Sequence, residues 1–172
     1  MMIRGRSLLS ALLLVALTGC GYHATIPQSR HLGAHQQIWV PFFANESISP
    51  TAQTVLRRAF YDEFHARRGL NPANSEMNAD LLMKARLVSY TTKAMSYSAL
   101  DQIREYSLVL DVELEISKKG EAAPLWKGQL QGSKQFPANT NLAFQRNAED
   151  QALDAAARII AQKFISALEE SY

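Results

Sequence analysis

A run of strict alternation between Tyr106 and Ile116 constrains the fold more than any other feature of this 172-residue chain. Every second residue of the run is large and apolar, and the residues between them include Asp111, Glu113 and Glu115. Successive side chains of a β-strand point to opposite faces of a sheet. The pattern therefore predicts a strand over residues 104–117, with one face on a core and the other on water or a polar partner.

The acidic residues of this strand suggest a cation site at first sight. Alternate carboxylates, however, lie about 7 Å apart along a strand. Lys84, Arg86 and Lys127 fall on the neighbouring predicted strands and are better partners for these carboxylates. We therefore expect cross-strand ion pairs at these positions and no metal site.

The remaining elements follow from hydrophobic periodicity and turn residues. The predicted order is β-α-β-β-β-α, with strands at 37–43, 79–92, 104–117 and 125–136, and helices from about 50 to 68 and from 141–147 to 168. Both helices are apolar on one side only. The sequence thus predicts an α+β, two-layer sandwich in which two helices pack on one face of a mixed four-stranded sheet.

Several single residues mark boundaries and close contacts. Ser49 and Pro50 are expected to open the first helix and Gly69 to end it. Pro41 cannot donate to a β-ladder, so the first strand should have an edge or a bulge there. Gly132, like Gly128, belongs to the inner face of the last strand and leaves room for a helix to approach or a bulge to form.

The first helix carries four arginines that fall mostly off its apolar stripe. We interpret them as a solvated helix face, with an anionic-lipid patch as the rarer alternative. They are Arg57, Arg58, Arg67 and Arg68.

The amino-terminal segment has the layout of a secretory signal peptide, with Arg4 and Arg6 ahead of an apolar run over residues 8–17. The run ends in Leu17-Thr18-Gly19-Cys20, a lipobox in which the thiol becomes the acylation site. Residues 1–19 are therefore predicted to be a lipoprotein signal peptide and Cys20 the lipid-attachment site. The alternative is an ordinary signal peptide with a chance cysteine. Cys20 is the only cysteine, so a disulfide has no second partner.

Removal of the signal peptide takes the formal net charge from +2 to 0. A neutral domain lacks the basic footprint that nucleic acid requires. The covalent acyl and diacylglycerol groups are expected to hold the protein on the membrane, and no other cofactor is predicted. Gly21, rather than an aspartate, follows the cysteine, which favours the periplasmic side of the outer membrane. Residues 20–36 read as a lipidated tether and residues 37–172 as a single domain.

Catalytic motifs are missing from the sequence, which has no Gly-x-Ser-x-Gly, no phosphate-binding glycine loop and no metal-ligand cluster. His31 and His35 are four residues apart, but Gly33 lies between them and no helical pattern surrounds them. We expect the protein not to be an enzyme.

Five short segments are spread over nearly the whole mature chain: Cys20-Gly21-Tyr22-His23, Val40-Pro41-Phe42-Phe43-Ala44-Asn45, Ala79-Asp80, Glu105-Tyr106-Ser107-Leu108 and Leu125-Trp126. In their order and spacing, these segments resemble the lipopolysaccharide-assembly lipoproteins of the LptE type.

The resemblance implies a protein that plugs the large outer-membrane β-barrel LptD and helps it assemble. That complex inserts lipopolysaccharide into the outer leaflet. The resemblance also implies basic contacts to the glycolipid before the third strand and before the last helix. Lys93, Arg104 and Arg146 occupy those regions here, and Lys134 is a further candidate.

A second class of function stays open from the sequence. A periplasmic adaptor lipoprotein of the same shape would bind another envelope protein or a peptidoglycan enzyme through its exposed sheet face. A free lipid carrier would need an internal apolar cavity, which the paired apolar stripes do not suggest.

Overall fold

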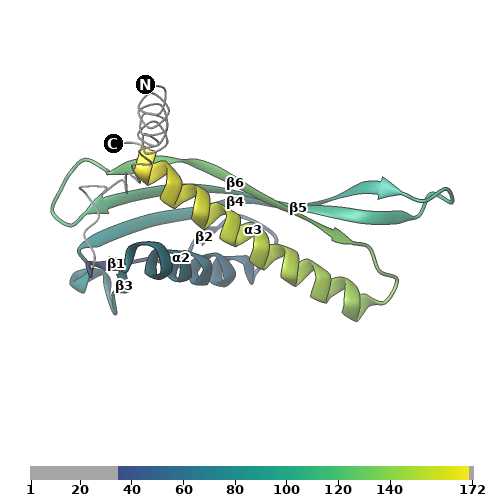
Figure 1. The fold of residues 1–172 in the computed structure, drawn as a ribbon, viewed down its shortest axis with the longest axis horizontal. Helices are drawn as coiled ribbons and strands as arrows, with labels where there is room; N and C mark the ends of the chain where they lie inside the picture. The colour runs from purple at the N-terminus through teal and green to yellow at the C-terminus, as the bar shows by residue number, and fades with distance from the viewer. Residues whose placement is uncertain (1–34, 171–172) are drawn as a thin grey trace, which may run out of the picture.

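The computed structural model describes residues 35–170, so the predicted signal peptide, Cys20 and most of the predicted tether lie outside the described part. Two helices pack on one face of a long twisted sheet (Figure 1). The strands are β1 (Gln37–Trp39), β2 (Ala44–Asn45), β3 (Asn71–Pro72), β4 (Leu81–Tyr97), β5 (Ile103–Lys118) and β6 (Trp126–Pro137). The helices are α2 (Ala52–Arg68) and α3 (Leu142–Glu170), and a short 3-10 turn covers Glu76–Asn78.

The sheet is mixed, as predicted. Its strand order is β3-β1-β4-β5-β6, and β2 also pairs with β4. β1 runs parallel to β3 and β4, whereas β4, β5 and β6 are antiparallel. The predicted α+β class is confirmed, but the sheet has six strands rather than four. The two additional strands, β2 and β3, are two residues long and carry no periodic pattern.

Pro41 divides the predicted first strand into two pieces. Ile38 pairs with Leu81 in β1, and the chain pairs with β4 again only at Ala44. The backbone of Val40 is satisfied by side chains: its N–H donates to the Tyr61 hydroxyl at 3.1 Å, and its carbonyl accepts from Arg57 Nε at 2.8 Å. The expected irregularity at Pro41 is confirmed, whereas the continuous strand over 37–43 and the turn beginning at Ala44 are wrong.

Helix α2 begins at Ala52, two residues later than the sequence predicts. Ser49 does not cap the helix because the preceding loop is folded on itself. Asn45 Nδ2 donates to the Ser49 carbonyl at 2.7 Å, and the Ser49 N–H donates to Ser47 Oγ. The other end is as predicted, because Gly69 ends the helix in a left-handed conformation with φ of 61°.

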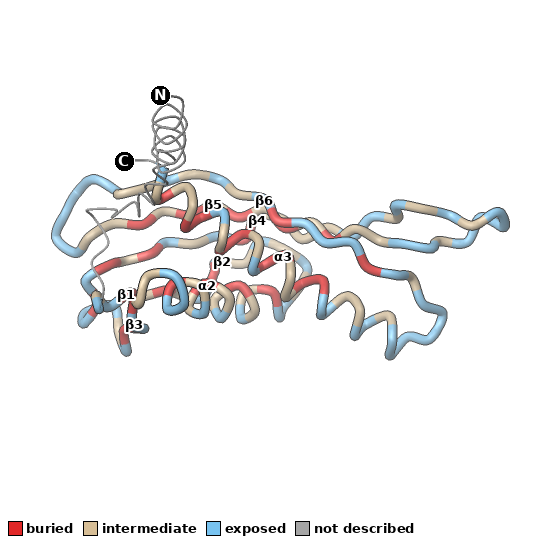
Figure 2. Tube along the Cα trace, viewed as in Figure 1, coloured by how far each residue is buried: buried red, intermediate tan, exposed pale blue. Residues whose placement is uncertain are grey.

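The core lies between the helices and the central part of the sheet (Figure 2). Five alternate residues of β5 are buried, namely Leu108, Leu110, Val112, Leu114 and Ile116, as the alternation predicts. An aromatic cluster joins both helices to the sheet: the Phe164 ring lies 5.6 Å from Phe60 and 5.0 Å from Trp126, both edge to face. Such pairs add stabilisation beyond the burial of their area.

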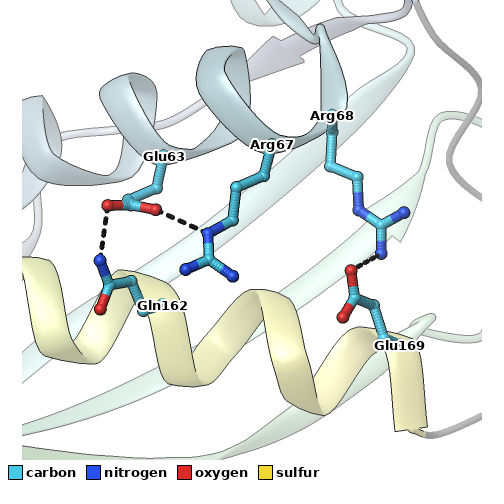
Figure 3. A network of polar contacts seen from close by, with 5 residues as sticks. All are labelled: Glu63, Arg67, Arg68, Gln162 and Glu169. Carbon is cyan, nitrogen blue, oxygen red and sulfur yellow. Dashed lines mark hydrogen bonds and ion pairs between the residues drawn. The ribbon is translucent and has the colours of Figure 1, made fainter.

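Polar contacts also join the two helices (Figure 3). Gln162 Nε2 donates to Glu63 at 2.9 Å, and Glu63 accepts from Arg67 at 3.0 Å. Arg68 pairs with Glu169 of α3. Arg67 stays largely exposed, as expected of a solvated face, whereas the Arg68 side chain is only 13% exposed.

The other face of the sheet is covered by paired charges. Lys84 Nζ and Lys127 Nζ lie 2.9 and 3.1 Å from the two carboxylate oxygens of Glu115. Arg86 pairs with Glu113 at 2.5 Å and with Glu46 at 3.0 Å. The predicted cross-strand ion pairs are therefore confirmed for Glu113 and Glu115. Among residues 35–170, Asp111 pairs with no cation and instead accepts hydrogen bonds from Ser89 Oγ at 2.6 Å and Gln131 Nε2 at 2.8 Å.

Helix α3 passes very close to β6 at Gly132. A Cβ at this position would lie 2.5 Å from the Ala156 carbonyl oxygen and 2.6 Å from the Ile160 side chain. The expected close approach of a helix is confirmed at Gly132. At Gly128 a Cβ would instead meet the far end of the Trp126 ring, at 2.8 Å.

We expect Gly132→Ala to lower the free energy of unfolding by about 1–3 kcal/mol, because the added methyl group forces α3 away from the sheet. Gly128→Ala is the matched control and should cost less, because the added methyl group meets only the far end of the partly exposed Trp126 side chain rather than a backbone atom. Urea denaturation of the purified protein measures both. Equal stability of Gly132→Ala and the wild type would contradict the close packing.

The second expectation concerns pH. Hydrogen bonds from Lys84 and then Lys127 lower the pKa of the Glu115 carboxyl below its ordinary value of 4.5. A lowered folded-state pKa means that the stabilisation is complete above the ordinary value and is lost as the pH falls through the folded-state pKa. Replacing both lysines with methionine should raise the carbon-13 NMR titration midpoint of Glu115.

Lys118→Met is the control for this titration, because Lys118 pairs with Glu121 instead. It should leave the Glu115 midpoint in place. An unchanged midpoint in the double variant would rule out the two lysines as the cause.

Candidate functional site

The central strands extend well beyond the core at one end of the molecule. β4 continues to Tyr97 rather than stopping at residue 92, and it pairs with β5 as far as Ile103. Residues 93–97 and 103–107 therefore form a projection about 16 Å long, which is two-stranded at its tip and still paired with the end of β6 at residues 105–107. None of the residues in either stretch is buried, and Figure 2 shows the projection as exposed and intermediate along its whole length.

Helix α3 also reaches beyond the core at the same end (Figure 1). Asn141 caps the helix, because its Oδ1 accepts hydrogen bonds from the N–H groups of Ala143 and Phe144. The first buried residue of α3 is Ala152 and Ala148 is partly buried against the core, so it is the first turn and a half, residues 142–147, that reaches past the core. We call this region the distal end: residues 93–107 of the hairpin, the end of β6 with the following loop (134–141), and residues 142–149 of α3.

A tyrosine–carboxylate contact marks where α3 leaves the sheet. Tyr90 of β4 donates its hydroxyl to Glu149 Oε1 at 2.6 Å. Burial, followed by the hydrogen bond to Glu149, raises the pKa of Tyr90 well above its ordinary value. Tyr90 therefore remains a neutral donor at any physiological pH and can hold this part of α3 against β4.

Large apolar side chains are exposed at the distal end. Met95 is 53% exposed and Leu100 is 82% exposed on the hairpin, and Phe144 is 63% exposed on the first turn of α3. Tyr97 and Leu142 belong to the same set. These side chains lie on two separate elements, the β4–β5 hairpin and the start of α3, and each leaves apolar area in contact with water. Sequence reasoning missed this set, because nothing in the local pattern says that the core ends before these residues.

The four predicted glycolipid contacts lie at the distal end or at its border, each on a different element. Lys93 is on β4, Arg104 on β5, Lys134 on β6 and Arg146 on α3, and all four are exposed. Within residues 35–170, no carboxylate lies within ion-pairing distance of any of them. The lysines and arginine of the outer sheet face, by contrast, are engaged with Glu113 and Glu115.

The strand register separates two of these cations. Lys134 pairs with Leu108, whose side chain is buried under the helices, so Lys134 belongs to the helix-covered face. Lys93 pairs with Ser107, the next residue of β5, and so belongs to the opposite face. The fold thus distributes the predicted contacts around the projection and does not gather all four into one pocket.

The outer face of the sheet is the other candidate surface. It has a shallow hollow of about 470 Å³ over β4, β5 and β6, with Arg86, Glu113, Glu115 and Lys127 in its lining. These charges neutralise each other. Hydrogen bonds to Glu113 and then Glu46 raise the pKa of Arg86 further above its ordinary value. The hollow therefore offers a charged but balanced surface, whereas the four cations of the distal end have no carboxylate partner among residues 35–170.

Among residues 35–170, no three His, Cys, Asp or Glu side chains lie close enough together to hold a metal ion. None of the helices in that part is long and apolar enough to cross a membrane.

Solved structures of other bacterial proteins share this fold. Rare lipoprotein B from Shewanella oneidensis is similar with a TM-score of 0.53 at 10% identity, over 78% of this chain and 95% of that one. PelC from Paraburkholderia phytofirmans, solved as a dodecamer, is similar with a TM-score of 0.52 at 16% identity, over 80% of this chain and 89% of that one. At such identities the similarity shows the fold alone.

No curated protein sequence matches the chain. The model of one protein family, described as LptE: lipopolysaccharide-assembly, matches residues 36–168, which is nearly the whole of the described domain. The chain belongs to the LptE family of lipopolysaccharide-assembly proteins.

Proposed function

We propose that this protein is a lipoprotein, attached through Cys20 to the periplasmic side of the outer membrane, that plugs the LptD β-barrel and helps it assemble. In that complex it assists the insertion of lipopolysaccharide into the outer leaflet. The observation that carries the proposal is the distal end, where four exposed cations without carboxylate partners accompany a set of exposed apolar side chains.

The chemistry of the distal end suits an anionic glycolipid. Lipid A carries phosphate groups, and arginine and lysine side chains bind phosphate oxygens through charge-assisted hydrogen bonds. Its acyl chains would find apolar contacts at Met95, Leu100 and Phe144, which water otherwise surrounds. In this proposal Lys93, Arg104, Lys134 and Arg146 are the phosphate contacts, placed on different elements so that a ligand moving past meets them in turn.

The rest of the molecule suits the interior of a barrel. The lumen of a large outer-membrane barrel is polar. The outer sheet face presents neutralised ion pairs, which a water-lined wall accepts without leaving a buried charge unpaired. The protein acts by fitting and binding in this proposal, without catalysis and with no cofactor beyond the acyl and diacylglycerol groups on Cys20.

Isolation of the intact complex tests the barrel partner. After gentle detergent extraction, the affinity-tagged protein should co-purify with a large heat-modifiable barrel, and depletion should remove mature barrel and surface lipopolysaccharide. Cys20→Ala, exported by a cleavable signal, should weaken membrane attachment and retain the barrel. Recovery of a soluble envelope enzyme in place of the barrel would favour the periplasmic adaptor instead.

Titration with purified lipopolysaccharide tests the distal end. We expect replacement of Lys93, Arg104, Lys134 and Arg146 together by glutamine to weaken binding by about tenfold or more, since charged hydrogen bonds contribute more than neutral ones. The matched control replaces Lys84 and Lys127, which are paired with Glu115, and should leave the affinity within about twofold of the wild type. If both variants lost the same affinity for lipopolysaccharide, the loss would reflect the change in net charge, and the distal end would not be a specific binding site.

A further inference from the structure

Arg57 stands apart from the other arginines of α2. Arg58 pairs with Asp154, Arg67 with Glu63 and Arg68 with Glu169. Arg57 has no carboxylate partner within the described residues 35–170. Its partners are the Val40 carbonyl, which accepts from Nε at 2.8 Å, and three aromatic rings.

The rings surround the guanidinium group. Its central carbon lies 4.5 Å from the ring centroid of Phe42, 5.3 Å from that of Tyr61 and 5.5 Å from that of Trp39. All three distances fall within the range of cation–π attraction, which fixes the orientation of the cation. Phe42 is nevertheless 60% exposed, so the group opens toward solvent. We call these four residues the arginine–aromatic platform.

No side-chain carboxylate of the described residues 35–170 partners Arg57. Residues 1–34 and 171–172, which lie outside the described part, contain no aspartate and no glutamate. Within the described part, every carboxylate is beyond ion-pairing distance of Arg57. Among residues 35–170 the terminal nitrogens of Arg57 therefore have no side-chain carboxylate to pair with, and a carboxylate of a bound partner can supply one.

We propose that the arginine–aromatic platform docks an aspartate or glutamate side chain on a loop of the partner barrel. This inference rests on the proposed function and adds a specific contact to it. The Nε of Arg57 is already used by Val40, so the terminal nitrogens remain to pair with a carboxylate. The rings around the guanidinium exclude water from such a pair and supply area for the apolar neighbours of the carboxylate.

A protein carboxylate fits this site better than a lipid phosphate does. Arg57 is a single cation, and none of the groups in contact with its guanidinium is a second one. Phosphate groups are better served by the several cations of the distal end. Tryptophan, tyrosine and arginine are the residues that most often dominate the affinity of protein–protein interfaces.

A purely structural role for Arg57 makes a different prediction. In that case its function is to hold Val40 at the break caused by Pro41, a task that it shares with the hydroxyl of Tyr61. Tyr61→Phe removes the hydroxyl contacts to Val40 and keeps both the ring and the Arg57 charge. This variant therefore separates the support of Val40 from docking.

The experiment compares barrel retention by the tagged full-length protein with that of three variants. Arg57→Gln should retain about tenfold less barrel, because an interfacial carboxylate loses its partner. Tyr61→Phe and Arg58→Gln should retain the barrel within about twofold of the wild type, since exposed ion pairs such as that of Arg58 contribute little. Circular dichroism melting of each variant verifies that it is folded.

A photoreactive phenylalanine analogue at position 42 gives a second measurement in an otherwise unchanged protein. We expect it to crosslink to a barrel peptide that contains an aspartate or glutamate. Neutralising that carboxylate should reduce retention as much as Arg57→Gln does, with no further loss when both changes are combined.

The outcomes separate the two proposals. A wild-type protein that retains no barrel defeats the proposed function and the docking contact with it. A wild-type protein that retains the barrel while Arg57→Gln retains as much defeats only the docking contact. Equal losses in Arg57→Gln and Tyr61→Phe, or a crosslink to lipopolysaccharide or to a peptide without an acidic residue, also overturn the contact and leave the proposed function standing.

Discussion

The burial of one face of β5 under two helices is the interaction on which the rest of this structure depends. Alternate residues from Leu108 to Ile116 are removed from water, and Phe60 of α2 and Phe164 of α3 meet over them. Gly132 lets α3 come close enough to close this core. Because apolar burial is the dominant favourable contribution to folding, the register of β4 and β6 on β5 follows from it. That register also brings the opposite charges of the outer face together.

The limited length of the core explains why the molecule has a distal end. The helices cover the part of the hairpin away from its turn, where the buried residues of β4 and β5 lie between Leu81 and Leu87 and between Leu108 and Ile116, and the turn end of β4 and β5 and the start of α3 continue beyond it. In the part of the sheet that the helices cover, Lys84, Arg86 and Lys127 of the outer face pair with Glu113 and Glu115. At the distal end Lys93, Arg104, Lys134 and Arg146 have no such partner among the residues described. The same fold thus produces a neutral sheet face and a set of cations that remain free to bind an anion.

The arginine–aromatic platform has its origin in a backbone requirement. Pro41 ends the ladder of β1, and the N–H and carbonyl of Val40 then need other partners. Tyr61 and Arg57, one turn apart on α2, supply them. The same arrangement places a guanidinium among aromatic rings without a carboxylate. Arg57 uses its Nε to satisfy the Val40 carbonyl, and its terminal nitrogens are left as donors beside the exposed ring of Phe42.

The class of fold, the faces of the long strands and the pairing of Glu113 and Glu115 with Lys84, Arg86 and Lys127 could be predicted from the sequence. This was possible because alternation and helical spacing report directly which side of an element is buried. The resemblance to the LptE type, which the family match confirms, named the four candidate glycolipid residues, and their role stays a prediction. The tertiary structure alone decided the two-residue strands, the start of α2, the length of the projection and the faces of Lys93 and Lys134. It also decided the surroundings of Arg57. Each of these depends on contacts between residues far apart in the chain, or on where the core ends, and no local pattern records either.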